Sequence, residues 1–408
     1  MKIKKIFYHL DCTLRDGGYY NNWNFDIDLI NDYLKVMSEI QIDYVELGFR
    51  SLDVSEFRGA CAYTTDKFIE SLKIPRKLNI SVMVNAAELI KFEKFEDNLK
   101  LVKKLFKEAK KTKIKLIRIA THYAELTKIL PLAKYLKEKG YIVAINLMQI
   151  SDRKENDIKN FCKLAKKNKI DILYFADSTG SLDNVQTLRI VNLFKKYWNK
   201  NIGIHAHDNM YKAMENTILA IDNHVNWIDS TVLGMGRGPG NVKTENLILE
   251  IEKRFNKKIN YLNLFKLVQE KFEPLKKKYQ WGSNSYYYLS GLYGIHPSFI
   301  QGMLADKRFT IPEILSVIDN LKTKGGKKFS KELLNTYREN YSGRGKGSYD
   351  PSKDIHNKDV LILGTGPSVE EHRLAIENFV KNKKPFVIAL NTQNCLKSKL
   401  INVRAVCH

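Results

Sequence analysis

The chain has 408 residues and a formal net charge of +23, from 68 Lys and Arg against 45 Asp and Glu. This length suits one large α/β domain with a smaller second unit, and a hydrophobic fraction of 44% excludes a disordered or fibrous chain. The positive charge could indicate a nucleic-acid partner. However, the lysines are spread along helix-like stretches such as residues 100–113 and are not gathered with aromatic residues, so we expect no nucleic-acid binding.

The cysteines and the apolar runs of the sequence indicate the cellular compartment of the protein. The five cysteines form no CxxC pair and leave one over: Cys12, Cys61, Cys162, Cys395 and Cys407. This pattern is typical of a reducing cytosol and argues against a disulfide framework or a structural zinc. The longest apolar candidate, residues 141–150, has the length of a core strand, and no run is signal-like or long enough to cross a membrane. We therefore expect a cytoplasmic protein without a membrane partner.

Short apolar, β-branched runs alternate with longer amphipathic, Lys-rich stretches from the start of the chain to about residue 250. The runs are nearly all apolar, as in parallel strands that are buried on both faces. They are residues 6–11, 44–49, 79–84, 116–121, 142–148, 171–177, 201–207 and 227–234. Eight such strands, separated by helix-like segments, are the number expected of a TIM (β/α)₈ barrel.

A doubly wound open sheet would give the same alternation, and the ends of the runs separate the two folds. Most runs end in polar residues: Asp11, Glu46, Asn85, Thr121 with His122, Asn146, Asp177 with Ser178, His205 with His207, and Ser230. A barrel brings all these ends together at one mouth, whereas an open sheet spreads them along an edge. The sequence therefore predicts an α/β protein with a TIM barrel and a site at the carboxyl ends of its strands.

The composition divides the chain into segments. We place the barrel at residues 1–255 and a helical, aromatic post-barrel subdomain at 256–341. A Gly-, Ser- and Lys-rich linker is expected at 342–353. Residues 354–408 have the pattern of a strand, a glycine turn, a helix and a strand, which predicts a partial Rossmann-like α/β unit. Because so short a unit cannot bury an ordinary α/β sheet, we expect it to be truncated or to pack on the barrel.

A histidine pair ends the seventh predicted strand. His205 and His207 are two residues apart, so in a strand both imidazoles point to the same side. Two imidazoles with an oxygen ligand suit a divalent ion such as Mn²⁺, Zn²⁺ or Fe²⁺. Asp16 follows the first strand, which in a closed barrel lies one strand away from the seventh, and can supply the carboxylate. Asn241, in the glycine-rich segment 234–241, could contact the metal shell, with a structural turn as the alternative.

Arg15 directly precedes Asp16 in the chain. If Asp16 binds a metal, the Arg15 guanidinium can hold a substrate carboxylate or stabilise a developing enolate oxygen. The alternative is a salt bridge to Glu46, at the end of the second run. The two roles of Arg15 are compatible, because a salt bridge to Glu46 would fix the orientation of the guanidinium toward the substrate.

Three segments in this order resemble the DRE-TIM metallolyase superfamily, also called HMGL-like. They are DCTLRDG at 11–17, GIHAHDN at 203–209 and GMGRGPGN at 234–241. The group includes 3-hydroxy-3-methylglutaryl-CoA lyase, isopropylmalate and homocitrate synthases, and 4-hydroxy-2-oxovalerate aldolase. The resemblance covers about residues 6–300.

The resemblance implies a TIM barrel with a divalent metal held by Asp16, His205 and His207. We expect Mn²⁺, with Mg²⁺, Zn²⁺ or Co²⁺ as alternatives. It further implies that Arg15 stabilises a 2-oxo acid enolate. Arg15 and Glu46, with the aspartate of the first motif, match the signature for which the superfamily is named.

Residues 117–125, IRIATHYAE, resemble the fourth strand of the aldolase branch and imply an aldolase-type lyase. The aldolase carries an acid/base histidine four residues after the arginine, and here that position is Tyr19, followed by Tyr20. A tyrosine hydroxyl, with an ordinary pKa near ~10, is a poorer base than imidazole. Either tyrosine could act as a proton donor, or another group, such as His122 or a metal-bound water, could take the role. Tyr286 could match the tyrosine that the aldolase uses from its post-barrel segment, with core packing as the alternative.

We therefore predict a divalent-metal-dependent lyase that makes or cleaves a carbon–carbon bond between a 2-oxo acid, through a pyruvate-type enolate, and an aldehyde. Two alternatives use the same barrel. One is an acyl-CoA-dependent Claisen-type synthase, and the other is a binding protein that has lost its base. We also expect a homo-oligomer.

The C-terminal unit contains a second candidate site. Gly364, Gly366 and Ser368 lie in GTGPS, between a predicted strand and a predicted helix. Backbone amides in such a turn could surround the phosphate of a nucleotide or a nucleotide sugar. The alternative is a merely structural turn.

Overall fold

The computed structural model describes residues 7–256, 258–306, 309–330, 332–334, 336 and 350–406. The chain folds into two compact units, Met1–Tyr341 and Ser342–His408. Residues 342–349 of the expected linker lie outside the described residues, and 352–355 form the short helix α18.

Eight parallel strands of the first unit form a closed barrel in the order of the sequence, with β1 hydrogen-bonded to both β2 and β8. The strands are β1 Tyr8–Asp11, β2 Tyr44–Phe49, β3 Asn79–Asn85, β4 Ile114–Thr121, β5 Ile142–Leu147, β6 Ile172–Asp177, β7 Asn201–Ala206 and β8 Trp227–Ser230. Each corresponds to one of the eight predicted runs. The predicted TIM barrel is confirmed.

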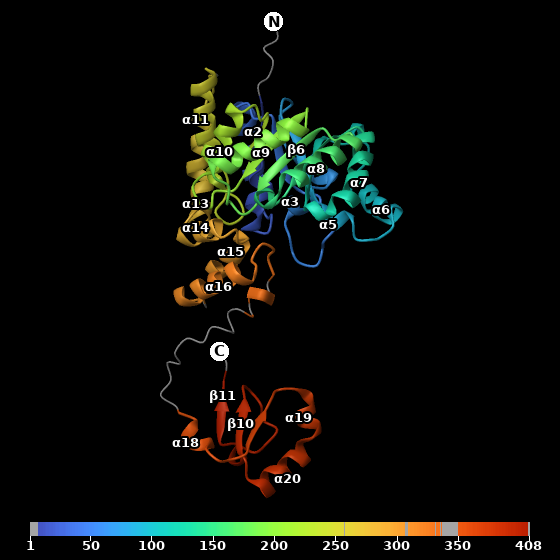
Figure 1. Cartoon of the computed structure of the whole chain (residues 1–408). Coiled ribbons are helices and arrows are strands. Elements are labelled where there is room, and N and C mark those ends of the chain that lie inside the picture. Colours follow the sequence, from blue (N-terminus) through green and yellow to red (C-terminus); the bar gives the residue numbers. More distant parts are fainter. Residues whose placement is uncertain are drawn as a thin grey trace. The chain divides into compact units, whose positions relative to one another are not determined.

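Helices surround the barrel (Figure 1). The longer ones are α2 Ile27–Glu39, α4 Asp66–Ser71, α6 Phe95–Leu105, α7 Leu126–Glu138, α8 Glu155–Lys167, α9 Asn184–Tyr197, α10 Ala213–Asp222 and α11 Thr244–Phe255. Short turns occupy α1 Thr13–Asp16, η1 Gly17–Tyr19, α3 Ala60–Tyr63, α5 Ala86–Leu89, η2 Ala109–Lys111, η3 Tyr123–Glu125, η4 Ile150–Asp152 and η5 Val232–Gly234. Helix α2 illustrates why they form: Asp26 caps its first turn by accepting hydrogen bonds from the backbone N–H groups of Asp28 and Leu29.

The interior of the barrel has an apolar floor below a polar mouth. Eight buried side chains pack together in this floor: Leu10, Cys12, Tyr44, Leu116, Ala144, Ile172, Tyr174 and Trp227. In β4, Leu116 belongs to the floor, and Arg118, two residues further on, points to the same side of the strand. Arg118 is fully buried and pairs with carboxylates of β2 and β8. The apolar floor therefore ends where the strands begin to present charged groups.

The post-barrel segment consists of two parts. Helix α12 Leu262–Leu267, the π-helix η6 Val268–Phe272 and helix α13 Glu273–Tyr279 contribute apolar side chains to the barrel's outer core. Helices α14 Ser285–Leu292, α15 Pro297–Ala305 and α16 Ile311–Lys324 form a core of their own around Phe299, Ile300 and Val317. Asn209, after β7, donates hydrogen bonds to the Tyr287 carbonyl and the Ser290 hydroxyl and so ties α14 to the barrel.

The second unit is a small three-stranded parallel sheet in the order β11-β10-β9. Its elements are α18 Ser352–Ile355, β9 Val360–Leu363, α19 Pro367–Glu371, α20 Arg373–Lys383, β10 Phe386–Leu390, η7 Ser398–Leu400 and β11 Val403–Ala405. A compact group of side chains, including Leu363, Val380 and Val387, forms its core. The predicted α/β unit at the C-terminal end is confirmed.

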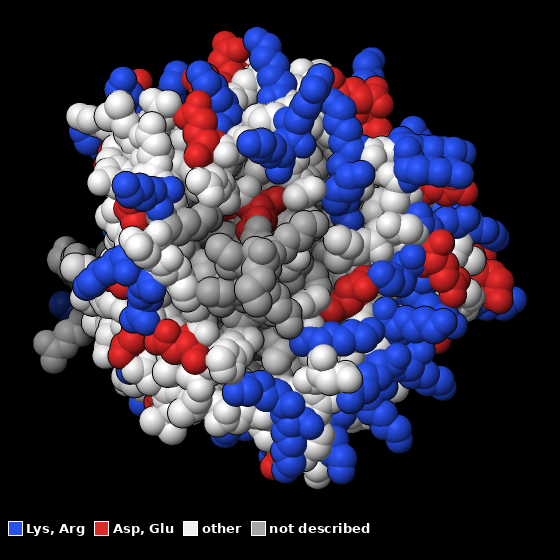
Figure 2. All heavy atoms as spheres, turned by 90° about the horizontal axis from the view of Figure 1, so that it is seen from above, with Lys and Arg blue, Asp and Glu red and all other residues white. Residues whose placement is uncertain are grey.

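Charges of both signs are interspersed on the face shown in Figure 2. Lys and Arg lie along much of its rim, with Asp and Glu between them. Among the described residues, no helix is both long enough and apolar enough to cross a membrane.

Candidate active site

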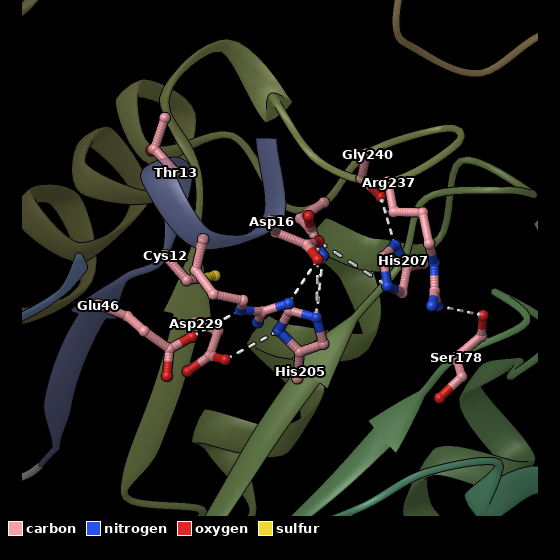
Figure 3. A network of polar contacts seen from close by, with 12 residues as sticks. Cys12, Thr13, Asp16, Glu46, Ser178, His205, His207, Asp229, Arg237 and Gly240 are labelled. Carbon is pink, nitrogen blue, oxygen red and sulfur yellow. Dashed lines mark hydrogen bonds and ion pairs between the residues drawn. The ribbon is translucent and has the colours of Figure 1, made fainter. Parts of the chain in front are cut away.

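Three potential metal ligands meet at the mouth of the barrel. Asp16 comes from the short helix α1, and His205 and His207 come from the end of β7. Their ligand atoms all lie within 4.8 Å of one another. Nε2 of His205 is 3.8 Å and Nε2 of His207 is 3.9 Å from Oδ2 of Asp16. In Figure 3 the three side chains point toward one another.

The two imidazoles are oriented by hydrogen bonds on their other nitrogens. Nδ1 of His205 is 2.8 Å from Oδ2 of Asp229, in β8, and Nδ1 of His207 is 3.2 Å from the Gly240 carbonyl. Because these acceptors require a proton on Nδ1, the lone pair of each neutral ring lies on Nε2. Both lone pairs therefore face Asp16, which is the arrangement that metal-binding histidines adopt.

The oxygen atoms of this cluster also suit a cation. Among the described residues, Oδ2 of Asp16 and Oδ1 of Asn241 are buried without a hydrogen-bond partner. The Asn241 amide lies against the site, with Nδ2 3.3 Å from Nε2 of His205. Burial raises the pKa of Asp16, but nearby positive charges, chiefly that of Arg15 and also that of Arg237, outweigh burial and hold it below its usual value. The donor set of one carboxylate, two imidazoles and one amide fits a divalent metal.

The glycine-rich segment 234–241 closes one side of the site. A Cβ atom on Gly236 would lie 1.9 Å from Oδ1 of Asn241 and 2.8 Å from Oδ2 of Asp16. Glycine at this position therefore lets the backbone approach the ligands closely.

A buried ionic network holds Arg15. Its Nε donates to Oε1 of Glu46 at 2.7 Å, and its NH1 pairs with Asp16. Arg118 donates to Oε2 of Glu46 at 2.7 Å and to Oδ2 of Asp229 at 2.6 Å. Glu46 thus bridges two guanidinium groups, and Asp229 joins Arg118 to His205. Among the described residues, NH2 of Arg15 is buried without a partner and is left for a ligand.

A second group of metal-ligand type shares part of this network. Cys12, His205 and Asp229 also lie close enough to hold an ion. However, burial raises the pKa of the Cys12 thiol well above its usual value, which disfavours the thiolate that binds metals. Asp229 is already paired with Arg118. The group containing Asp16 is therefore the stronger candidate.

The four residues considered for proton transfer lie in different environments. The Tyr19 ring packs on Trp23, with ring centroids 4.8 Å apart. The Tyr20 hydroxyl donates to the Gly238 carbonyl at 2.6 Å, and burial raises its pKa to about 12. His122 follows β4 and is half-buried, and burial lowers its pKa. Tyr286 packs against the core of the α14–α16 segment.

Tyr287, rather than its neighbour Tyr286, reaches the loop at the mouth. Its hydroxyl lies 3.4 Å from that of Tyr20. The Asn284 side chain caps α14 by accepting from the backbone N–H groups of both tyrosines, and so sets the direction in which each points.

Sequence reasoning did not single out three residues that the fold brings to this site, Arg118, Asp229 and Arg237. It also missed His296, which directly precedes Pro297 where that residue contacts Gly238 of the loop 234–241. Arg118 and Asp229 were isolated charges within apolar runs, which could have marked them as buried and paired. Arg237 belongs to the glycine-rich segment 234–241. Its NH2 donates a hydrogen bond to the Ser178 carbonyl at 3.2 Å (Figure 3). Its guanidinium lies 5.6 Å from the centroid of the Tyr19 ring. His296 stood before a proline, a common pattern at a helix start.

In the C-terminal unit, the GTGPS turn joins β9 to α19. Gly366 is the N-cap of α19, and the Gly364 carbonyl accepts a hydrogen bond from Nε2 of Gln393 at 2.6 Å. Gly366 and Ser368 are exposed.

Together, the fold and the site define a TIM barrel with a buried Asp-His-His metal-ligand set at the carboxyl ends of its strands. The chain belongs to the HMGL-like family, whose model matches residues 7–270. The resemblance to the DRE-TIM superfamily is therefore confirmed.

Two curated relatives carry the names of lyase reactions. A 4-hydroxy-2-oxovalerate aldolase from Pelotomaculum thermopropionicum is 26% identical over 328 residues, which is 78% of this chain and 91% of the relative. An oxaloacetate decarboxylase from Mycobacterium tuberculosis is 24% identical over 250 residues, 60% of this chain and 70% of the relative.

Solved structures agree with the fold. The N-terminal domain of a protein described as a candidate aldolase, from Bacteroides vulgatus, is 32% identical with a TM-score of 0.65, covering 76% of this chain and 99% of that domain. A Bacillus subtilis HMG-CoA lyase has a TM-score of 0.53 at 15% identity, covering 71% of this chain and 98% of the lyase. The second likeness bears on the fold alone.

Proposed function

We propose that this protein is a divalent-metal-dependent lyase that makes or cleaves the bond between C3 and C4 of a 4-hydroxy-2-oxo acid. The observation that carries the proposal is a group of buried, unpartnered polar atoms at one point among the described residues. Oδ2 of Asp16 and Oδ1 of Asn241 suit a cation, and NH2 of Arg15 beside them suits an anionic oxygen. The names of the two curated relatives support the same class of reaction.

The proposed ligands are Asp16, His205 and His207, with Asn241 at the edge of the shell. When bound, the metal would supply a Lewis acid that polarises the 2-oxo group and favours an enolate. Mn²⁺ is our first choice, with Mg²⁺, Zn²⁺ and Co²⁺ as alternatives, because hard oxygen ligands and imidazoles accommodate all four.

Arg15 would stabilise the charge that develops on the 2-oxo acid. Its guanidinium is held by Glu46 and Asp16, so it is preorganised and needs no rearrangement during the reaction. Glu46 is fully buried and accepts hydrogen bonds from both Arg15 and Arg118, so we assign it a positioning role.

His122 is our candidate for the acid/base. In cleavage it would take the proton from the C4 hydroxyl, the C3–C4 bond would break with its electron pair entering the enolate, and the C4 oxygen would become the aldehyde carbonyl. Protonation at C3 then gives a pyruvate-type product. A half-buried imidazole with a lowered pKa is neutral at pH 7 and can accept that proton, whereas burial raises the pKa of Tyr20 to about 12.

The test is pyruvate release from a panel of 4-hydroxy-2-oxo acids with added Mn²⁺, beside an EDTA control and the Asp16→Asn variant. Metal-dependent release that is absent in the variant would support the proposal. Acetyl-CoA-dependent release of free thiol with a 2-oxo acid, in the absence of any cleavage, would instead support the Claisen-type synthase.

Three further assignments stay predictions. They are a cytoplasmic location, a homo-oligomeric state, and a nucleotide or nucleotide-sugar site at Gly364, Gly366 and Ser368. Binding of a nucleotide panel to the full chain, with Gly366→Val as the matched variant, would test the last.

A further inference from the structure

His296 lies at the start of α15, in the segment that follows the barrel. Its side chain caps the helix, because ring Nδ1 accepts a hydrogen bond from the Ser298 N–H at 3.3 Å. Its own N–H donates to the Gly326 carbonyl at 2.8 Å. The backbone and the ring of His296 are thereby both held by hydrogen bonds, and the ring cannot rotate without losing the bond that caps the helix.

Helix α15 is fastened to the loop that carries the metal-ligand Asn241 and to the segment after Asp16. The Gln301 side chain accepts from the Gly238 N–H at 3.0 Å and donates to the Tyr19 carbonyl at 3.1 Å. A Cβ atom on Gly238 would lie 2.8 Å from Cβ of Pro297, so the loop and the helix start are in direct contact. These contacts hold His296 beside the mouth of the barrel.

The hydrogen bond to Nδ1 determines which tautomer His296 adopts. Since Nδ1 uses its lone pair to accept the Ser298 N–H, the neutral ring carries its proton on Nε2. Burial lowers the pKa of His296 well below its usual value, and the nearby positive charge of Arg237 lowers it further. The positive end of the helix dipole acts in the same direction. The ring is therefore neutral at pH 7 and is a hydrogen-bond donor rather than a base.

The loop contacts also indicate the side of the site on which His296 lies. A Cβ atom on Gly236 would lie 2.8 Å from Oδ2 of Asp16, whereas Gly238, two residues further along the same loop, contacts Pro297, which directly follows His296. His296 therefore lies further along this loop than the metal-ligand cluster, so the distal end of a substrate with its carboxylate at Arg15 would lie nearer to His296.

We propose that His296 donates a hydrogen bond from Nε2 to the C4 oxygen of the substrate. This inference rests on the proposed lyase function. When the C4 hydroxyl gives its proton to His122, its oxygen gains negative charge before it becomes the aldehyde carbonyl, and in condensation the same oxygen gains charge again. A neutral imidazole at a helix N-terminus can polarise such an oxygen without itself being protonated. The metal ligands and Arg15 would meanwhile serve the C2 end.

Two reactions separate this role from a structural one. Cleavage of 4-hydroxy-2-oxovalerate develops charge on the C4 oxygen. Decarboxylation of oxaloacetate gives the same enolate, but its C4 carboxylate loses its charge as CO₂ leaves, so a donor there brings no advantage. The variants are His296→Asn, in which asparagine can still cap the helix, and His296→Gln, with His224→Asn in an exposed loop as the control.

We expect His296→Asn to lower kcat for cleavage by about 10²–10³-fold, the cost of removing one oxyanion donor. We expect decarboxylation to change by less than about 3-fold, Gln to restore part of the cleavage rate, and the pH profile to keep its shape. Equal losses in both reactions, an unchanged cleavage rate, or loss of the acid limb of the profile would each overturn the donor role. A wild-type protein with neither reaction would instead refute the lyase function on which the inference rests.

A second measurement does not depend on activity. In protein labelled with ¹⁵N-histidine, the His296 ring is assigned by its absence from the His296→Asn spectrum. We expect Nε2 protonated and Nδ1 unprotonated from pH 6 to 8. A ring that becomes doubly protonated at neutral pH in that range would overturn the inference.

Discussion

Asp229 and His205 form a buried hydrogen bond of 2.8 Å between Oδ2 and Nδ1, and this contact directs Nε2 of His205 toward Asp16. The two residues lie on the neighbouring strands β8 and β7. Asp229 also accepts from Arg118 at 2.6 Å, so the same carboxylate connects the metal-ligand cluster to the charged layer above the barrel floor. A change at Asp229 should therefore alter both metal affinity and stability.

We predict that Asp229→Asn lowers the affinity for Mn²⁺ by about 10–100-fold, as is typical when the hydrogen-bond partner of a metal-binding histidine is removed. An asparagine can still accept from Nδ1, but it lacks the charge that makes the imidazole a stronger ligand. Isothermal titration of the metal-free protein with Mn²⁺ measures the change. Asp222→Asn, in an exposed ion pair, is the control. Equal affinities in wild type and Asp229→Asn would contradict the assigned role.

Arg118→Met should destabilise the protein by about 3–5 kcal/mol, because it leaves two buried carboxylates, Glu46 and Asp229, without their shared partner. Urea unfolding measures the free energy. The matched control is Arg254→Met, which breaks a partly exposed pair with Asp222 and should cost no more than about 1 kcal/mol. A similar free energy of unfolding for the two variants would show that the network contributes little.

Gly236→Ala should weaken metal binding while the barrel stays folded. Its Cβ atom would lie 1.9 Å from Oδ1 of Asn241 and 2.8 Å from Oδ2 of Asp16, so the amide must move away from the site. We expect at least a 10-fold lower Mn²⁺ affinity with little change in far-UV circular dichroism. Gly302→Ala is the control, since its Cβ would lie 3.5 Å from Leu334, an ordinary contact. Unchanged affinity in Gly236→Ala would argue that Asn241 lies outside the metal shell.

The barrel and its metal-ligand cluster could be predicted because both follow from short-range patterns. Apolar runs of strand length mark buried parallel strands. Because His205 and His207 are two residues apart in a strand, their side chains point to the same side of it. The pairing of Arg118 with Asp229 could not be predicted in this way, because the two residues are 111 positions apart and meet only when the barrel closes.

The residues supplied by the post-barrel helices were harder to predict for a related reason. Their direction depends on how each helix is capped and docked. The Asn284 cap fixes the rotation of α14, so that Tyr287, and not Tyr286, points to the Gly238 loop. Neighbouring residues of a helix point in different directions, so an error of one residue in a predicted helix assigns the wrong side chain to the site. Helix α15, which begins directly after His296, lies against the mouth because Gln301 fastens it to two loops of the barrel. Neither docking contact has a local signature in the sequence.

The pH dependence of cleavage tests His122. A general base works only when it is unprotonated, so the rate is lost as the pH falls through its pKa. Burial lowers the pKa of His122, and the positive charges of Lys328, Arg153 and Arg237 add to this effect against the opposing charge of Glu125. The acid limb of the kcat/KM profile should therefore have its midpoint below the usual histidine value of about 6.5, with most of the rate retained at pH 7.

In His122→Gln that limb should disappear, and kcat for cleavage should fall by about 10²–10⁴-fold, because glutamine can form hydrogen bonds but cannot accept the proton. Decarboxylation of oxaloacetate needs no base at C4 and should be retained. Tyr19→Phe serves as the comparison, since the Tyr19 ring packs on Trp23 and that packing survives loss of the hydroxyl. If Tyr19→Phe, and not His122→Gln, removes the acid limb and the cleavage rate, the acid/base role passes to the tyrosine, and the imidazole of His122 is left with a positioning role at the end of β4.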